Sequence, residues 1–144
     1  IVDAQHQRLI AVCEEHQEQQ EAENYLATIA LNNDRASIKK LQAGADFYAY
    51  PRLSPDQTRL CWIQWSHPNM PWDSSELCLA SLSQTGISEP RVIAGSNGDE
   101  AIFQPHWSPD SDLYFVSDKT NWWNIYHFDG SENISFLRLR DFRS

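Results

Sequence analysis

The chain has 144 residues, of which 41% are apolar and 12% aromatic, so it is long and apolar enough to build a sizeable core. Its formal net charge of -9 repels phosphate backbones, which argues against nucleic acid as a partner. No run approaches the roughly 18 apolar residues of a membrane-spanning helix, so neither such a helix nor a membrane partner is expected.

The three cysteines are Cys13, Cys61 and Cys78, and no CxxC pair is present. An odd number of widely spaced cysteines is typical of reduced thiols, so we expect a cytoplasmic protein. The histidines fit no HExxH metal frame, and we predict no metal ion and no cofactor. The chain begins with Ile1 rather than an initiator Met, so we expect it to be part of a longer gene product.

In chain order, the first unit contains three apolar segments that read as strands, namely Arg8–Val12, Asn24–Ile29 and Ser37–Leu41. A helix is the alternative, because residues 11–30 are rich in Glu, Gln and Ala. We favour strands, since Leu9 and Tyr25 fall in register with residues of later units. Residues 14–23 then form a polar hairpin loop.

The second and third units each contain Ser-Pro-Asp before an apolar run. Ser54–Asp56 precedes Leu60–Ile63, and Ser108–Asp110 precedes Leu113–Val116. Each Ser-Pro-Asp is preceded by a proline three residues before its serine, and these two prolines, Pro51 and Pro105, lie 105 − 51 = 54 residues apart. Proline presets φ while Ser and Asp hydrogen-bond the backbone, so the element predicts a tight hairpin between two strands.

A unit of four short antiparallel strands over roughly fifty residues is typical of a propeller blade. We therefore predict an all-β fold, a partial β-propeller of about three blades of four-stranded antiparallel sheets. The expected division is a partial blade at 1–43 and blades at 44–95 and 96–144. The first unit is expected to lack its Ser-Pro-Asp turn because the chain begins too late to contain it. Closure requires at least four blades, so edge strands and one side should stay open.

Three stretches carry a family resemblance: 45–56, 65–73 with "HPNMPWD", and 113–118 together with "NWWN" at 121–124. They resemble the N-terminal β-propeller of prolyl oligopeptidase-family serine peptidases, especially bacterial dipeptidyl aminopeptidase and acylaminoacyl-peptidase-like enzymes. The resemblance covers essentially the whole chain. The family usually has glycine after Ser-Pro-Asp, where this chain has Gln57 and Ser111, so the turn is either of another type or mildly strained.

The resemblance implies an α/β-hydrolase domain in the same polypeptide, with a G-x-S-x-G nucleophile elbow. That motif is absent here, so no serine is predicted as a nucleophile and no catalytic residue is assigned. Whether the chain is itself an enzyme stays open, and the parent protein is expected to be a serine peptidase. The expected function is a non-catalytic propeller segment that gates the access of short peptides. The alternative is a TolB-like propeller that acts as a protein-interaction module.

The candidate site is a loop that faces a substrate peptide or the hydrolase domain, formed by His67, Asn69, Met70, Trp72, Asp73 and Trp122. We favour the alternative for the tryptophans, in which Trp72 is buried between neighbouring blades and Trp122 or Trp123 packs in the core, as aromatic side chains usually do. Asp46 and Glu100 precede equivalent strands and could bind a peptide amino terminus. We favour the simpler role, in which they accept hydrogen bonds from loop amides.

Overall fold

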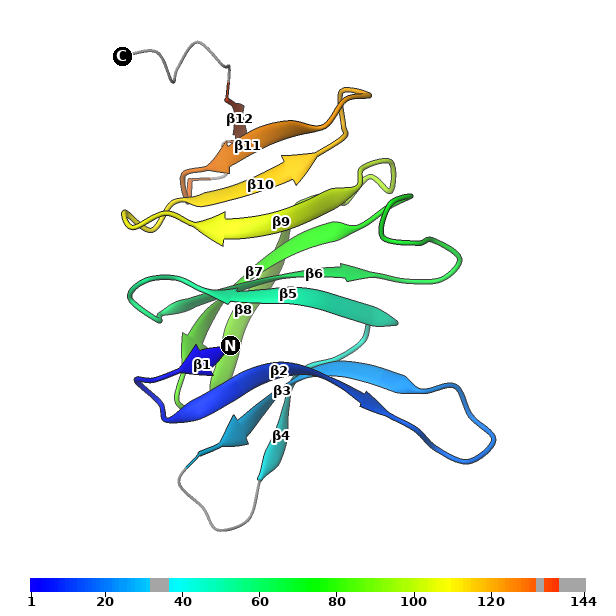
Figure 1. Cartoon of the computed structure of the whole chain (residues 1–144), viewed down its shortest axis with the longest axis vertical. Helices are drawn as coiled ribbons and strands as arrows, with labels where there is room; N and C mark the ends of the chain where they lie inside the picture. Colours follow the sequence, from blue (N-terminus) through cyan, green and yellow to red (C-terminus); the bar gives the residue numbers. More distant parts are fainter. Residues whose placement is uncertain (32–36, 132–133, 138–144) are drawn as a thin grey trace.

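The computed structural model describes residues 1–31, 37–131 and 134–137, and every regular element within them is a strand. Twelve strands form three four-stranded antiparallel sheets, each with its strands in chain order (Figure 1). Sheet 1 contains β1 (Val2–Asp3), β2 (Arg8–Glu15), β3 (Glu23–Ala30) and β4 (Ile38–Gln42). The predicted all-β partial propeller is confirmed.

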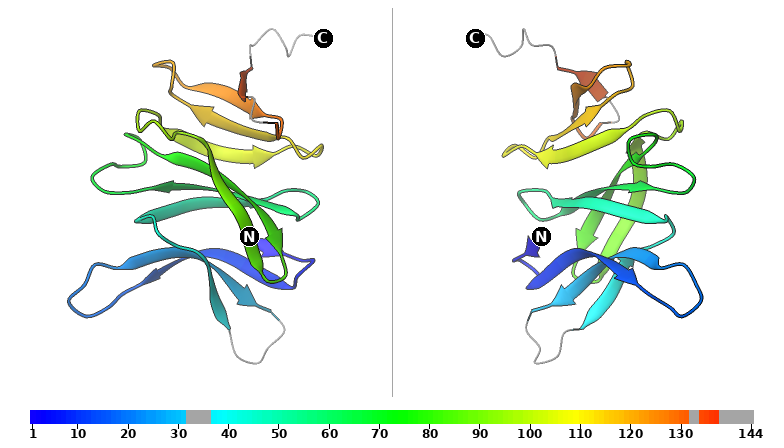
Figure 2. Two further views of the ribbon diagram at one scale, coloured as in Figure 1. Left: turned by 180° about the vertical axis from the view of Figure 1, so that it is seen from behind. Right: turned by 45° about the vertical axis from the view of Figure 1, so that its right-hand side comes forward.

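The other two sheets repeat this order. Sheet 2 contains β5 (Phe47–Leu53), β6 (Arg59–Trp65), β7 (Glu76–Ser83) and β8 (Gly86–Ala94). Sheet 3 contains β9 (Ile102–Trp107), β10 (Leu113–Ser117), β11 (Asn124–Phe128) and β12 (Ile134–Phe136). Figure 2 shows the sheets following one another along the long axis, with sheet 2 between the others and no closure of the series.

The segment with helix-forming composition is a β-hairpin, as the register with later units predicted. β2 pairs with β3 from Arg8 opposite Ala30 to Glu15 opposite Glu23. The connecting loop therefore covers residues 16–22 and is shorter than the predicted 14–23, because the ladder continues beyond the apolar residues. No described helix is long and apolar enough to cross a membrane.

The Ser-Pro-Asp element joins β5 to β6 through a side-chain network. The Ser54 hydroxyl donates to Asp56 Oδ1 at 2.6 Å and accepts from the Arg59 amide at 3.0 Å. Thr58 donates to the same carboxylate oxygen through its amide at 3.1 Å and its hydroxyl at 2.7 Å. The hydrogen bonds from Ser54 and Thr58 lower the pKa of Asp56 to about 2. These contacts make the element a structural turn.

The residues that replace the usual glycine adopt a left-handed conformation. Gln57 has a φ of 59° and Ser111 a φ of 67°. Of the two alternatives left by the sequence, the structure therefore has the turn with mildly strained residues. Further left-handed residues precede the strand prolines, at Tyr50, Glu89 and Gln104. Each lies where the strand register shifts, so the prolines occupy β-bulges and interrupt no regular ladder.

The first unit lacks Ser-Pro-Asp as expected, but the expected reason is wrong, because the chain does contain the corresponding turn. Residues 4–7 form a turn between β1 and β2, and Asp3 takes the place that Ser54 has in the second unit. The buried Asp3 carboxylate accepts from Arg8 Nε at 2.8 Å. Arg8 also donates to the carbonyl oxygens of Ser83 at 2.6 Å and Gln84 at 3.0 Å in sheet 2. A carboxylate thus holds an arginine that links two sheets.

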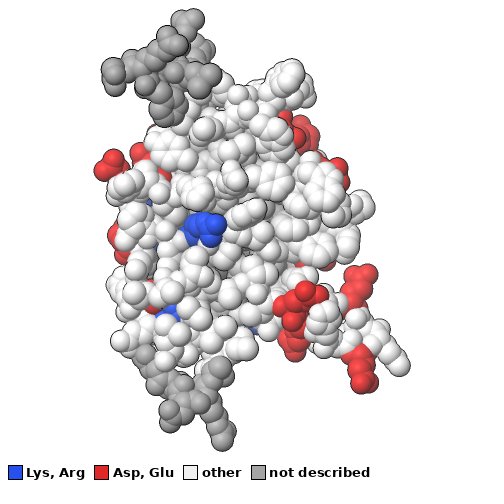
Figure 3. All heavy atoms as spheres, in the orientation of Figure 1, with Lys and Arg blue, Asp and Glu red and all other residues white. Residues whose placement is uncertain are grey.

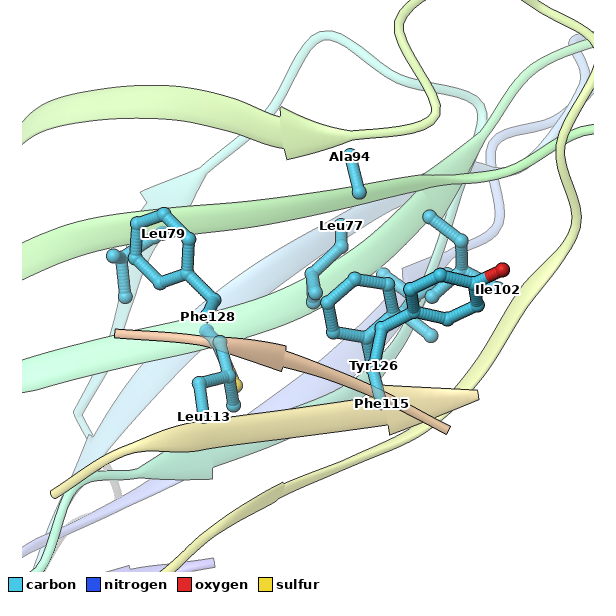
Figure 4. Packing of buried hydrophobic residues seen from close by; sticks show 10 residues of the cluster. Leu77, Leu79, Ala94, Ile102, Leu113, Phe115, Tyr126 and Phe128 are labelled. Carbon is cyan, nitrogen blue, oxygen red and sulfur yellow. The ribbon is translucent and has the colours of Figure 1, made fainter. Parts of the chain in front are cut away.

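Sheet 2 is buried on both faces, because successive residues of a strand point to opposite sides. Towards sheet 3, its side chains pack with Leu113, Phe115, Tyr126 and Phe128, as Figure 4 shows for Leu77, Leu79 and Ala94. Towards sheet 1, the alternate residues of the same strands pack around Ile10 and Leu26, among them Leu60, Trp62, Cys78 and Ala80. Sheet 2 therefore supplies half of the buried residues in the cluster towards sheet 3 and most of those in the cluster towards sheet 1.

The outward faces of sheets 1 and 3 carry apolar side chains that no described residue covers. Ile38 on β4 and Ile125 on β11 are both exposed, and each is paired with a residue that points away from sheet 2. In sheet 2 the strands β6 and β7 are mostly buried, and the exposed apolar residue Val92 lies on the edge strand β8. The predicted open side of a partial propeller is thereby found at both ends of the series.

We expect Phe115→Ala to lower the free energy of unfolding by about 3–5 kcal/mol, because Phe115 is fully buried between sheets 2 and 3. Ile125→Ala on the neighbouring strand is the matched control and should change stability by less than about 1 kcal/mol, since that side chain is exposed. Urea denaturation measures both. Equal losses for the two variants would contradict the packing between these sheets.

We expect Asp56→Asn to lower the melting temperature at neutral pH by an amount equivalent to less than about 1 kcal/mol, since the carboxylate is exposed and screened. The depressed folded-state pKa of Asp56 contributes stability above the ordinary value near 3.8, and this is lost as the pH falls through about 2. Thermal melts of both proteins between pH 7 and pH 2 should therefore converge at the acid end. A difference that persists unchanged at pH 2 argues against a role for the charge.

Candidate functional site

Long loops gather at one end of the three sheets, here named the loop end. It comprises the β2–β3 loop (16–22), the β6–β7 loop (66–75), the β10–β11 loop (118–123) and the connections 43–46 and 95–101. Both Ser-Pro-Asp turns lie at the opposite end (Figure 1). This separation follows from the antiparallel order, in which successive hairpins alternate between the two ends of a sheet.

The β6–β7 loop contains most of the predicted site residues and is held by its own backbone. Asp73 Oδ2 accepts from the Met70 amide at 3.0 Å, and the Asp73 and Ser74 amides both donate to the Met70 carbonyl oxygen. The Asn69 amide donates to the Ser66 carbonyl oxygen at 3.1 Å. Asp73 therefore shapes the loop, and the bonds leave the Met70 side chain free to face outward.

Asp46 fixes the start of this loop. Its Oδ2 accepts from the His67 amide at 2.8 Å, while its own amide donates to the Ser66 hydroxyl at 3.2 Å. The His67 ring packs edge-on against Phe47 with ring centroids 5.0 Å apart. The favoured interpretation of Asp46 as an acceptor for loop amides agrees with these contacts.

Glu100, at the equivalent position of the third unit, has a different partner. Its Oε1 accepts from the buried Ser117 hydroxyl at 2.6 Å, and its carbonyl oxygen accepts from the Ser75 amide at 2.9 Å. The prediction that the Glu100 carboxylate serves loop amides is therefore wrong. The side chain instead reaches the end of β10 within its own sheet, and the backbone joins the β6–β7 loop to sheet 3.

The large apolar side chains of the loop end are exposed. The exposed fraction is 58% for Trp72, 45% for Met70 and 77% for Trp122. Trp123, exposed by about half, contacts Phe103 with ring centroids 5.4 Å apart. The interpretation that buried Trp72 between blades and placed Trp122 or Trp123 in the core is wrong for the described chain, because the loops project beyond the sheets.

A hollow of about 220 Å³ lies between the β6–β7 loop and the connection 95–101. Of the predicted site residues, His67 and Asn69 line it, whereas Met70, Trp72 and Asp73 do not, and Trp122 belongs to the loop of the next sheet. The sequence did not reveal the other polar residues of the wall, which include Gln64, Ser66, Glu76 and Ser96. Gln64 and Glu76 face each other only through the register of β6 on β7, which no motif signals.

Gly95 determines how the loop and the connection meet. Its φ is 89°, and a Cβ at this position would overlap the Ser75 carbonyl oxygen. The Ser75 hydroxyl accepts from the Ile102 amide at 2.8 Å, so the same contact region also anchors sheet 3. Only glycine fits this left-handed and closely packed position.

The chemistry available at the loop end is that of binding. Among residues 1–31, 37–131 and 134–137, no three His, Cys, Asp or Glu side chains come close enough to hold a metal ion. The described serines with buried hydroxyls, such as Ser54 and Ser75, are engaged in turn and strand contacts. The features of the loop end that could contact another molecule are its exposed aromatic side chains, the hollow and the hydrogen-bonding groups that line it.

Comparison with solved structures relates the chain to puromycin-hydrolysing peptidases. A Mycobacterium tuberculosis puromycin-hydrolyzing peptidase matches with a TM-score of 0.84 and 32% identity over 96% of this chain. Puromycin hydrolase matches with a TM-score of 0.85 and 28% identity over 96%, and a mutant puromycin hydrolase complexed with PGG matches with 0.86 and 29% over 95%. This chain spans 22% of the length of each. No protein-family model and no curated protein matches.

We expect Gly95→Ala to lower the free energy of unfolding by about 2 kcal/mol or more, since a left-handed backbone and a steric overlap both oppose a Cβ. Gly98→Ala is the matched control, because Gly98 has a φ of 79° but no atom near the new Cβ, and should cost about 1 kcal/mol. Thermal and urea denaturation measure both. Equal costs would show that the contact with Ser75 contributes nothing.

Proposed function

We propose that this chain, a β-propeller segment of the prolyl oligopeptidase family, is a non-catalytic part of a peptidase and controls access to an α/β-hydrolase domain of the same polypeptide. The observation that carries the proposal is the match over 96% of the chain to peptidases of which it spans 22%. The absence of G-x-S-x-G from the sequence agrees with chemistry located elsewhere.

The arrangement of the loop end supports a role in contact with a substrate or with a domain. Exposed Trp72 and Trp122 project from neighbouring sheets at the same end, and large exposed aromatic side chains are common in binding surfaces. The sheets behind them are rigid, because their inner faces are tightly packed. A rigid ring with a narrow opening would admit short peptides and exclude folded proteins by size.

The expected substrates are therefore small. Puromycin, which the matched enzymes are named for hydrolysing, is a small molecule, and short peptides are the proposed class for this protein. Cys13, Cys61 and Cys78 form no disulfide, which supports the proposal of a cytoplasmic location.

In the protein that carries this chain, we expect kcat/KM to fall by at least about tenfold from a tripeptide amide to an unstructured peptide of about thirty residues, because the longer chain loses more conformational entropy on entering a narrow opening. The Trp72→Ala and Trp122→Ala variants should lower kcat/KM for the tripeptide about three- to tenfold through lost contact area. A chromogenic peptidase assay on the length series measures both effects.

Leu31→Ala is the matched control, since Leu31 is 51% exposed and follows β3 at the end of sheet 1 opposite the loop end. It should leave kcat/KM within about twofold of the parent protein. Hydrolysis that is independent of peptide length would contradict gating. A complete lack of peptidase activity in the folded parent protein would instead favour the interaction module.

A further inference from the structure

Glu76 in the wall of the hollow is a carboxylate with a fixed orientation. Gln64 Nε2 donates to Glu76 Oε2 at 2.9 Å, and the buried Trp62 indole donates to Gln64 Oε1 at 3.0 Å. The indole can only donate, so it forces the Gln64 amide to present its nitrogen to Glu76. This chain of hydrogen bonds requires Glu76 Oε2 to act as an acceptor.

Glu76 forms no ion pair with any described residue. The described ion pairs engage other carboxylates, those of Asp3, Glu14, Glu23 and Asp112. The only hydrogen bond to the Glu76 side chain within the described ranges is the one from Gln64, which leaves Oε1 available. A half-buried carboxylate that lacks a cation is an electrostatically favourable site for one.

The surroundings of Glu76 suit a small organic cation. The hollow of about 220 Å³ has room for a group of a few heavy atoms, and Trp65 and His67 are among the residues that line it. Ser66 and Ser96 line the same hollow, and a serine hydroxyl can accept N–H donors, although that of Ser66 already accepts from the Asp46 amide. A primary ammonium has three donors, and the Glu76 carboxylate is the charged acceptor that the hollow offers it.

The charge of the protein favours the approach of a cation. The net charge is -9, and the hairpin of β2 and β3 carries five glutamates at its tip, which projects at the loop end: Glu14, Glu15, Glu18, Glu21 and Glu23. Figure 3 shows acidic side chains gathered at this projection. Such a field raises the local concentration of cations and speeds their association.

We propose that the hollow between the β6–β7 loop and the connection 95–101 binds a primary ammonium group through Glu76. A peptide amino terminus and a lysine side chain share this chemistry, and the experiment below distinguishes them. The inference does not depend on the proposed peptidase role, because binding is measured on the chain itself without turnover.

The test is a titration followed by amide chemical shifts and by tryptophan fluorescence. The probes are n-butylammonium, glycyl-glycinamide for an amino terminus, Nα-acetyl-lysine methylamide for a side chain, and N-acetyl-glycinamide as the uncharged control. We expect the ammonium probes, and not the uncharged one, to shift the Gly95 and Ser96 amides of the hollow. The tighter of the two peptide-like probes identifies the source of the ammonium.

Glu76→Gln should weaken binding at least about tenfold, because it removes the charge but keeps an acceptor for Gln64. Glu21→Gln makes the same change in net charge on the exposed hairpin and should weaken binding less than about twofold. Equal binding to wild type and Glu76→Gln would overturn the proposal. The proposal would also be overturned if millimolar ammonium probes left the chemical shifts of the Gly95 and Ser96 amides unchanged in the wild-type protein. This second result does not depend on whether a variant folds.

Discussion

The burial of sheet 2 on both faces is the constraint on which the rest of the structure depends. Cys61 and Ile63 face sheet 3, while Leu60 and Trp62 from the same strand face sheet 1. A shift of one residue in the register of β6 would exchange these two sets and disrupt both hydrophobic clusters at once. The alternation of apolar side chains therefore fixes the order, spacing and pairing of the three sheets together.

This packing divides the molecule into a structural end and a loop end. At the structural end, short turns are stabilised by side-chain networks, and Arg8 and Arg59 each donate to a carbonyl oxygen of the next sheet. At the loop end, longer loops project beyond the packed sheets and leave Trp72 and Trp122 exposed. Aromatic groups in such positions add nothing to the core, and this exposure is the observation behind the proposal that they contact a partner.

The strands and their turns could be predicted from the sequence, because Ser54–Asp56 and Ser108–Asp110 recur beside similar apolar runs. For residues 11–30, the register of Tyr25 with residues of the later units correctly predicted strands, although the composition of this segment favours a helix. The loop end was less predictable, since the positions of Trp72 and Glu100 depend on contacts between sheets. Gln64 and Glu76 were missed because their pairing arises only when β6 lies beside β7. Sequence motifs predict the strands and turns in which they occur. The hollow is formed by residues from several strands and loops, so no single motif predicts it.

The proposed recognition at the loop end is tested by hydrogen–deuterium exchange of the protein with and without a short peptide amide. We expect slower exchange in the bound state at 66–75 and 95–101, with unchanged exchange at the Ser-Pro-Asp turns at the opposite end. Protection confined to those turns, or to the open faces of sheets 1 and 3, would contradict it.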